Sequence, residues 1–144
     1  MRSLAEYGIR PDTDLGQHFL LDENLVDLAI REAGVRPDDV VLEVGAGLGV
    51  LTAPLARAAG WVHAIELDRR LEPALAGALE GADNVALHWG DAMRLPVESF
   101  HPAPTALVAN LPYSIATPLV LESLWRLPAL ERWCVMVQRE VVDR

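Results

Sequence analysis

Short apolar runs alternate along the chain with segments whose apolar residues recur at helical spacing. The runs predict five strands, at residues 39–44, 61–66, 85–89, 105–110 and 132–137. The helical spacing predicts helices before and between them, at about residues 23–33, 51–59, 71–79 and 118–127. This alternation is typical of an α/β fold, in which a parallel sheet carries helices on both faces.

The first predicted helix has well-marked ends. Asp22 is a suitable N-cap, and Gly34 followed by Pro37 stops the helix. Its apolar residues at helical spacing are Leu25, Leu28, Ala29 and Ala33.

Composition favours a globular protein. The chain has 144 residues, 51% of them hydrophobic, which suits one domain with its own core. No apolar run approaches the ~18 residues that a membrane span needs, and residues 1–10 lack the apolar region of a secretion signal. We therefore expect a cytoplasmic protein that acts as a monomer without a membrane partner.

The formal charge of −9 argues against unaided nucleic-acid binding, because a polyanion is usually met by a basic surface. Cys134, the single cysteine, cannot form an internal disulfide, and its apolar neighbours favour a buried structural thiol. No spacing of His, Cys and Asp suggests a metal site.

A glycine turn at residues 45–49 joins the first strand of the predicted sheet to the next helix. Glycine lets the backbone turn sharply and approach a ligand closely. The dinucleotide-binding fingerprint G-x-G-x-x-G would need a third glycine at position 50, which is Val50. The G-x-G-x-G spacing therefore disfavours a nicotinamide cofactor, while tight helix–strand packing remains a purely structural explanation.

Two carboxylates follow neighbouring strands. Glu66 ends the second strand, where it could accept both ribose hydroxyls of a nucleoside ligand, and Asp91 lies beyond the third, where it could accept a hydrogen bond from an adenine amine. The structural alternatives are a solvated strand end or helix cap for Glu66, with Asp68 competing as the cap, and an Asx turn for Asp91.

The segment Asn110-Leu111-Pro112-Tyr113 follows the fourth predicted strand and suits methylation of an exocyclic amine. The Asn110 amide oxygen and the Leu111 carbonyl could accept hydrogen bonds from the two N–H groups of the amine. This arrangement directs the nitrogen lone pair at a methyl donor. Pro112 would hold these acceptors fixed, and Tyr113 offers a stacking face for a flipped base. A simple turn is the structural alternative.

The remaining aromatic and histidine residues have mainly structural interpretations. Trp61, Trp125 and Trp133 are expected to pack in the core or on helix faces, whereas Trp89 could border an adenine pocket. We expect His63 and His88 to be packed or edge residues rather than ligands.

Together, the motifs resemble the rRNA adenine N6,N6-dimethyltransferases, and most of all their bacterial small-subunit branch. The segments that carry the resemblance are residues 16–20, 45–49, 65–68, 90–92 and 110–118, in the family's order. The resemblance implies a Rossmann-like class I S-adenosylmethionine-dependent methyltransferase core that dimethylates two adjacent adenosines near the 3′ end of 16S rRNA.

The resemblance also implies roles for individual residues. His18 and Leu20 would close over S-adenosylmethionine, and the other expected cofactor contacts are Gly45, Glu66, Asp91 and Asn110. The expected catalytic residues are Asn110, Leu111, Pro112 and Tyr113, with Asn110 touching both cofactor and target.

The sequence departs from this family in three places. Position 18 is His where the bacterial family often has Asn, and residues 11–14 lack the lysine or arginine that relatives place there for RNA phosphates. Relatives also continue past Arg144 through more strands and a small helical domain, so residues 1–144 correspond to an incomplete catalytic domain.

Three alternatives stay open. One is a large-subunit rRNA adenine methylase of the resistance type. Another is a catalytically silent RNA-binding or ribosome-assembly factor that keeps the fold, and the last is a small-molecule methyltransferase.

Overall fold

The computed structural model describes residues 22–138 and leaves residues 1–21 and 139–144 undescribed. The elements are α1 (Glu23–Ala33), β1 (Val40–Val44), α2 (Thr52–Ala58), β2 (Trp61–Glu66), the 3-10 turn η3 (Arg69–Leu71), α3 (Glu72–Ala78), β3 (Val85–Trp89), the 3-10 turn η4 (Val97–Ser99), β4 (Ala106–Pro112), α4 (Tyr113–Arg126) and β5 (Arg132–Gln138). None of the helices within this range is long and apolar enough to cross a membrane.

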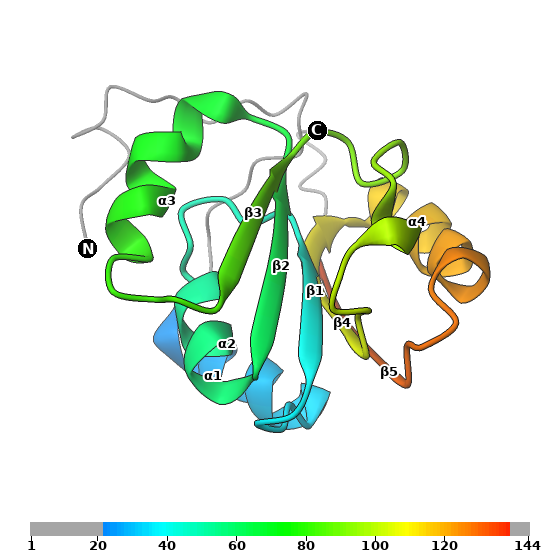
Figure 1. The fold of residues 1–144 in the computed structure, drawn as a ribbon, viewed down its shortest axis with the longest axis horizontal. Coiled ribbons are helices and arrows are strands. Elements are labelled where there is room, and N and C mark those ends of the chain that lie inside the picture. The colour runs from blue at the N-terminus through cyan, green and yellow to red at the C-terminus, as the bar shows by residue number, and fades with distance from the viewer. Residues whose placement is uncertain (1–21, 139–144) are drawn as a thin grey trace, which may run out of the picture.

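The strands form one parallel sheet in the order β3-β2-β1-β4-β5. Helices α1, α2 and α3 pack on one face, and α4 lies on the other (Figure 1). The predicted α/β architecture is therefore confirmed. Because every strand runs in the same direction, the carboxyl ends of all the strands meet at one edge.

Alternate residues of each central strand feed two separate cores. In β1, Val41 packs under α1 and α2, while its neighbour Leu42 packs under α4. Both side chains are almost completely inaccessible to solvent. A central strand that is buried on both faces reads as a continuous apolar run, which is why the strands were visible in the sequence.

The end of β4 and the start of α4 differ from the prediction. The sequence pattern ends the strand at Asn110 and begins the helix at Pro118, whereas β4 continues to Pro112 and α4 begins at Tyr113. Pairing of β4 with β5 extends the strand, since Leu111 and Pro112 have register partners in β5. Pro118 lies inside the helix, where its missing N–H costs one helical hydrogen bond without ending α4.

Helix α1 has the predicted bounds, and its buried face agrees only in part with the predicted apolar residues. The Asp22 carboxylate accepts a 2.8 Å hydrogen bond from the Leu25 N–H, and Gly34 closes the helix in the left-handed conformation. Ala29 and Ala33 of the predicted apolar set are buried, but Leu25 and Leu28 are exposed and Val26 is buried in their place. The sequence pattern thus placed the helix correctly and identified only part of its buried face.

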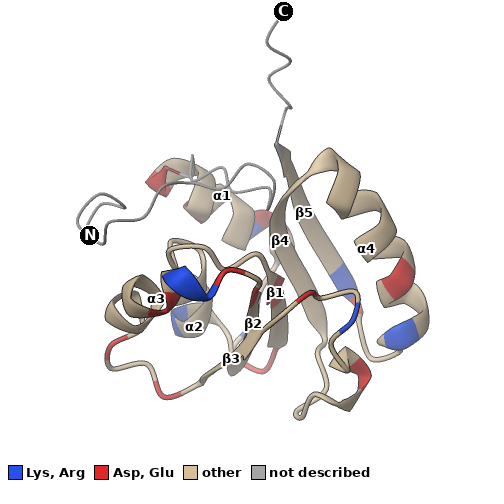
Figure 2. Ribbon diagram, turned by 90° about the horizontal axis from the view of Figure 1, so that it is seen from above, with Lys and Arg blue, Asp and Glu red and all other residues tan. Residues whose placement is uncertain are grey.

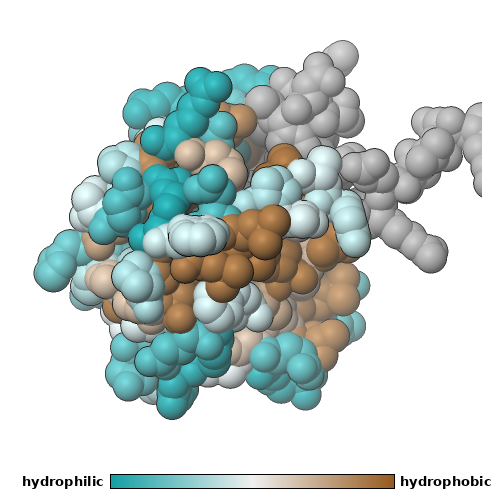
Figure 3. Space-filling view, turned by 90° about the vertical axis from the view of Figure 1, so that its right-hand side faces the viewer, coloured by the Kyte–Doolittle hydropathy of each residue, from teal (hydrophilic) through white to brown (hydrophobic). Residues whose placement is uncertain are grey.

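The tryptophan predictions are correct only in part. Trp133 donates a 2.8 Å hydrogen bond from its indole N–H to the Ser123 hydroxyl, which joins β5 to α4. Trp125 does not pack: 86% of it is exposed, on a face of α4 that also exposes Leu121 and Leu124. Figure 3 shows apolar side chains gathered on this side of the molecule. Trp125 points outward because the turns of α4 that face the sheet are occupied by Ala116, Leu119 and Ser123.

Cys134 is partly buried, with its sulfur 3.8 Å from the Ala29 carbonyl oxygen. Burial, and then the nearby charge of Glu32, raise the pKa of its thiol, as is typical of an unreactive cysteine.

His63 and His88 are packed residues, as predicted, and they lie against each other at the face of the sheet that Phe100 covers. The His63 Nε2 lies 2.9 Å from the Pro102 carbonyl oxygen, and its Nδ1 lies 3.0 Å from His88 Nε2. A carbonyl can only accept, so Nε2 of His63 carries the proton, and neutral His63 then accepts at Nδ1 from His88. Phe100 stacks on the His88 ring at 3.8 Å. The sequence showed neither this pairing nor the tautomers that it fixes.

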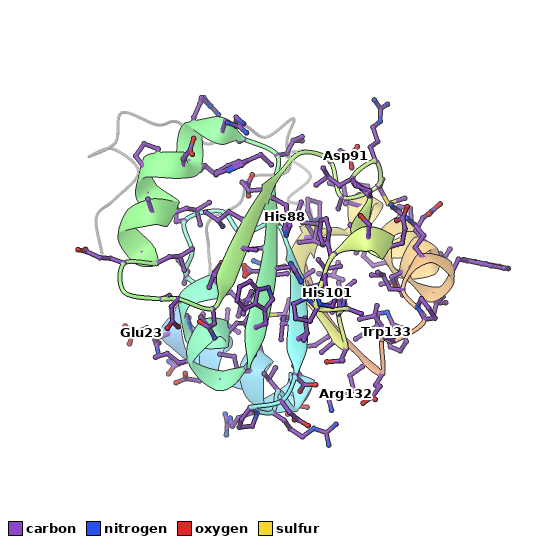
Figure 4. The ribbon with its side chains drawn as sticks, in the orientation of Figure 1. Glu23, His88, Asp91, His101, Arg132 and Trp133 are labelled. Carbon is purple, nitrogen blue, oxygen red and sulfur yellow. The ribbon has the colours of Figure 1, made fainter. Side chains whose placement is uncertain are left out.

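A polar network joins three strands at the edge opposite their carboxyl ends. Asp39 is paired with Arg132 at the start of β5, and it accepts a 2.9 Å hydrogen bond from the Thr105 hydroxyl. Figure 4 places Arg132 and Asp91 at opposite edges of the sheet. Burial raises the pKa of Asp39, but the Arg36 N–H, the Thr105 hydroxyl and the Arg132 charge outweigh burial and lower it.

Candidate cofactor and substrate site

The candidate site residues within residues 22–138 lie at the carboxyl edge of the sheet, at the ends of β1, β2, β3 and β4. Figure 4 shows Asp91 at this edge. Ligands of parallel α/β sheets bind in such a place. His18 and Leu20, which the family resemblance assigns to the cofactor, lie outside the described residues.

The glycine turn after β1 requires glycine at several positions. Gly45, Gly47 and Gly49 have positive φ angles of 85°, 57° and 80°. The turn is held from below by the Ile65 carbonyl, which accepts hydrogen bonds from the N–H groups of Gly45 and Ala46 at 2.9 and 3.1 Å. The turn is therefore a fixed part of the β1–β2 edge.

Gly45 brings the turn into contact with the end of β4. A Cβ atom at Gly45 would lie 3.2 Å from the Leu111 side chain and 3.6 Å from the Asn110 carbonyl oxygen. The turn and the Asn110–Tyr113 segment thus lie so close together that a side chain larger than that of glycine at position 45 would crowd Leu111. Sequence spacing could not show this contact, because β1 and β4 are far apart in the chain and adjacent in the sheet.

Glu66 is buried and its carboxylate is already engaged. One oxygen accepts a 2.8 Å hydrogen bond from the Gly47 N–H, and the other accepts from the N–H groups of Leu67 and Asp68 at 3.1 and 3.0 Å. Asp68 serves as the N-cap of η3 by accepting from the Arg70 N–H. Glu66 therefore ties the glycine turn to the end of β2, while Asp68 takes the capping role.

Asp91 forms the Asx turn that the sequence allowed. Its Oδ1 accepts a 2.9 Å hydrogen bond from the Met93 N–H, and its carbonyl accepts from the N–H groups of Arg94 and Leu95. The side chain is 47% exposed, and its Oδ2 lies 3.9 Å from Arg94. The turn therefore leaves a carboxylate oxygen accessible to a ligand.

Trp89, the last residue of β3, lies close to this turn. The Arg69 guanidinium lies over its ring, 5.6 Å from the centroid. Arg69 comes three residues after Glu66, and Trp89 comes two residues before Asp91. Their contact therefore links the segments that carry the two candidate carboxylates.

The Asn110–Tyr113 segment has a buried base and an exposed tip. Leu111 and Pro112 are buried, Asn110 is half-buried, and Tyr113 is 67% exposed as the first residue of α4. Within residues 22–138 the Asn110 amide makes no side-chain hydrogen bond, so its polar atoms are available to a ligand. An exposed aromatic ring beside a free amide fits a planar, polar substrate.

Glu43 is a buried carboxyl group that sequence analysis did not single out. It projects from β1 under α2, where its Oε1 accepts a 2.9 Å hydrogen bond from the Thr52 hydroxyl. The pKa of Glu43 is raised to about 8, mainly by burial; the Thr52 hydrogen bond opposes the rise and the Glu66 charge adds to it. A polar residue inside an apolar strand run was the available signal.

The parallel sheet, the glycine turn and the carboxylates at the strand ends define a Rossmann-like methyltransferase core. The chain belongs to the ribosomal RNA adenine dimethylase family, whose model matches residues 9–144.

Curated and solved relatives agree with this family. The chain is 51% identical over 145 residues to "Ribosomal RNA small subunit methyltransferase A" of Streptomyces griseus, covering 97% of this chain and 50% of that protein. A dimethyladenosine transferase from Plasmodium falciparum superposes with a TM-score of 0.74 at 30% identity, covering 85% of this chain and 44% of that one. The 23S rRNA methyltransferase ErmE also gives 0.74, at 33% identity, covering 85% of this chain and 49% of that one. The chain spans about half the length of the curated relatives it matches.

Proposed function

We propose that this chain forms the S-adenosylmethionine-binding and catalytic part of an rRNA adenine N6,N6-dimethyltransferase. The observation that carries the proposal is the close approach of Gly45 to the end of β4, where an added Cβ would lie 3.2 Å from the Leu111 side chain and 3.6 Å from the Asn110 carbonyl oxygen. It sets a cofactor turn of the methyltransferase type directly against a segment suited to hold an amine. The substrate that we propose is adenosine near the 3′ end of 16S rRNA, acted on in the cytoplasm by a monomer.

The site residues fit S-adenosylmethionine. The glycine turn, whose Gly45, Gly47 and Gly49 carry no side chain, lets the amino-acid part of the cofactor approach the backbone closely, and Asp91 offers an accessible oxygen to the adenine amine. A carboxylate has about four acceptor sites, of which Glu66 uses three for backbone N–H groups. Glu66 can therefore accept one ribose hydroxyl at once, and a second only by releasing one of these N–H groups.

When bound, S-adenosylmethionine supplies the electrophilic methyl group. The residues of this chain need only hold and orient the amine. The Asn110 amide oxygen and the Leu111 carbonyl oxygen accept hydrogen bonds from its N–H groups, and Tyr113 stacks on the base. Because Leu111 and Pro112 are buried and paired with β5, the backbone that carries the two acceptors is fixed before the substrate arrives. No strong base is needed, since the nitrogen loses its proton only after the new bond has formed.

The acidic charge places a condition on RNA binding. Arginines and carboxylates are interspersed on the ribbon in Figure 2, and five arginines pair with carboxylates, namely Arg36, Arg70, Arg94, Arg126 and Arg132. We therefore propose that Tyr113 and the neighbouring backbone contact the target base, with phosphate contacts coming mainly from other parts of the whole protein.

Calorimetric titration of the chain with S-adenosylmethionine, with NAD as the control ligand, tests the cofactor. We expect saturable binding of S-adenosylmethionine alone. Methyl transfer to isolated small-subunit rRNA then tests the reaction, and Asn110→Ala should abolish it. A folded chain that binds NAD equally well, or neither ligand, would refute the cofactor assignment.

A large-subunit target is the second candidate, because ErmE superposes as well as the dimethyladenosine transferase does. Parallel assays with 16S and 23S rRNA separate the two. Cofactor binding without transfer to either RNA would instead favour the silent RNA-binding factor, and transfer to small amines without RNA would favour a small-molecule methyltransferase.

A further inference from the structure

Arg126, the last residue of α4, reaches across to the segment that follows β3. Its guanidinium donates to the carbonyl oxygens of Ala92 and Met93 at 3.3 and 3.2 Å, and to the Leu95 carbonyl. It also donates twice to the Glu98 carboxylate, at 3.0 and 2.7 Å. One side chain thus holds the whole 92–98 segment.

These contacts are suited to fixing a backbone turn. Among residues 22–138, Arg126 is the only donor to the carbonyls of Ala92 and Met93. The guanidinium presents five donors in a planar fork, which lets it serve several carbonyls together. The Arg126 side chain is only 19% exposed, so its guanidinium makes these hydrogen bonds largely shielded from bulk water.

The base of Arg126 is itself fixed. Ser123, one turn earlier in α4, accepts the hydrogen bond from Trp133 in β5 and donates to the Val120 carbonyl. Leu119 and Leu127 are buried against the sheet on either side. Arg126 therefore extends from a helix that cannot shift without breaking its contacts with β5.

The contacts reach the candidate adenine site in two steps. Arg126 holds the Met93 carbonyl, and the Met93 N–H holds the Asp91 Oδ1. We propose that Arg126 is a positioning residue for adenine recognition, which orients the Asp91 carboxylate through Met93. This inference rests on the proposed function, because it presumes that Asp91 accepts the adenine amine.

The test compares two ligands that differ at the adenine amine; its replacement by oxygen also places a hydrogen on the neighbouring ring nitrogen N1. S-adenosylhomocysteine carries the N6 amine, whereas S-inosylhomocysteine carries an oxygen there that cannot donate to Asp91. Calorimetry on the wild-type chain should show a preference of about tenfold or more for the adenosyl ligand, as expected for a hydrogen bond to a charged acceptor.

Arg126→Met removes the donors and keeps the apolar stem. It should lower the affinity for S-adenosylhomocysteine about tenfold while leaving that for S-inosylhomocysteine within about threefold, so that the preference falls towards one. Arg126→Lys should fall between, because an ammonium cannot span the three carbonyls. Arg31→Met, an exposed change of the same charge on α1, should keep the wild-type preference.

Amide exchange at Met93 gives a readout that needs no ligand. Arg126→Met should speed exchange there and leave β1 and β2 protected, and Arg126→Lys provides the same readout if the Met variant does not fold. An equal loss of affinity for both ligands, an unchanged preference, or unchanged exchange at Met93 would overturn the inference. Failure of the wild type to bind either ligand would instead refute the proposed function, and the inference with it.

Discussion

The Thr52 hydroxyl, at the start of α2, donates a 2.9 Å hydrogen bond to the buried carboxyl group of Glu43 in β1. The net effect of burial, the opposing Thr52 hydrogen bond and the Glu66 charge raises the pKa of Glu43 to about 8. Glu43 is therefore mostly protonated at neutral pH, directly below the glycine turn. When Glu43 ionises, its buried charge destabilises the folded state.

This pKa predicts a pH dependence of stability. The folded state binds the Glu43 proton more tightly than the unfolded state, in which the pKa of this group is near 4.5. The stabilisation that comes from this tighter proton binding is fully present below pH 4.5. It is lost as the pH rises through the folded-state pKa of about 8. Between pH 6.5 and 8 the free energy of unfolding should fall by about 1 kcal/mol per pH unit from this group. Urea unfolding of Glu43→Gln should show a flatter slope in that window; equal slopes would contradict the prediction.

The two histidines should act in the opposite direction. Burial lowers the pKa of His63 and of His88, the Pro102 carbonyl partly opposes this at His63, and neighbouring histidine charges lower both further. The folded state then binds fewer protons than the unfolded state. The contribution of the two neutral histidines to the free energy of unfolding is therefore fully present above pH 6.5 and falls as the pH drops below that value. NMR titration should place both midpoints below 6.5. His88→Gln should make unfolding less sensitive to pH between 7 and 5.5, whereas a decline parallel to the wild type would contradict this.

Gly49 and Gly81 form a matched pair for measuring packing at the glycine turn. Both have positive φ, 80° and 84°, but a Cβ at Gly49 would lie 2.9 Å from the Ala78 Cβ, while nothing lies within 4 Å at Gly81. Gly81→Ala should cost about 1 kcal/mol of backbone strain. Gly49→Ala should cost about 1–3 kcal/mol more, because α3 must move. Equal losses in chemical denaturation would show that the turn and α3 are not tightly packed.

Glu66 and Tyr113 should separate cofactor binding from turnover. Glu66→Ala leaves three backbone N–H groups without their acceptor, so it should lower stability by about 1–3 kcal/mol and weaken S-adenosylmethionine binding. Tyr113→Ala removes an exposed ring and should change stability by less than about 0.5 kcal/mol, with its main effect on methyl transfer. Calorimetry and a transfer assay on small-subunit rRNA measure the two effects. Equal losses of cofactor affinity would rule out this division.

Elements marked by an apolar run or by capping residues were predictable from the sequence, and contacts between elements were not. The bounds of β2 and β3 follow from apolar runs that end at turn residues, and α1 follows from its capping residues. The start of α4 was missed because Pro118 reads as a first-turn residue, although the β4–β5 pairing sets the helix start at Tyr113. Pairing between strands thus sets the end of β4 and the start of α4, which the spacing of residues along the chain does not reveal.

The same division applies to the site. Glycine and carboxylate positions at strand ends were visible, because chain order and the parallel sheet together place them at one edge. The Glu66 bond to Gly47 and the Arg126 contacts to residues 92–98 were invisible, since they depend on side-chain reach between segments. Leu25 and Leu28 show the converse: apolar spacing marks a helix but does not decide which of its sides meets the sheet.

The strand order has a consequence for synthesis on the ribosome. β1, β2 and β3 pair in the order in which they are made, but β1 must wait for β4, which leaves the ribosome about sixty residues later, to cover its other side. During that interval a nascent chain presents β1 as an uncovered, strongly apolar border, which is the kind of surface that chaperones engage. The glycine turn meets Asn110 and Leu111 only when β4 has joined the sheet, so the candidate site is assembled late in the synthesis of the chain.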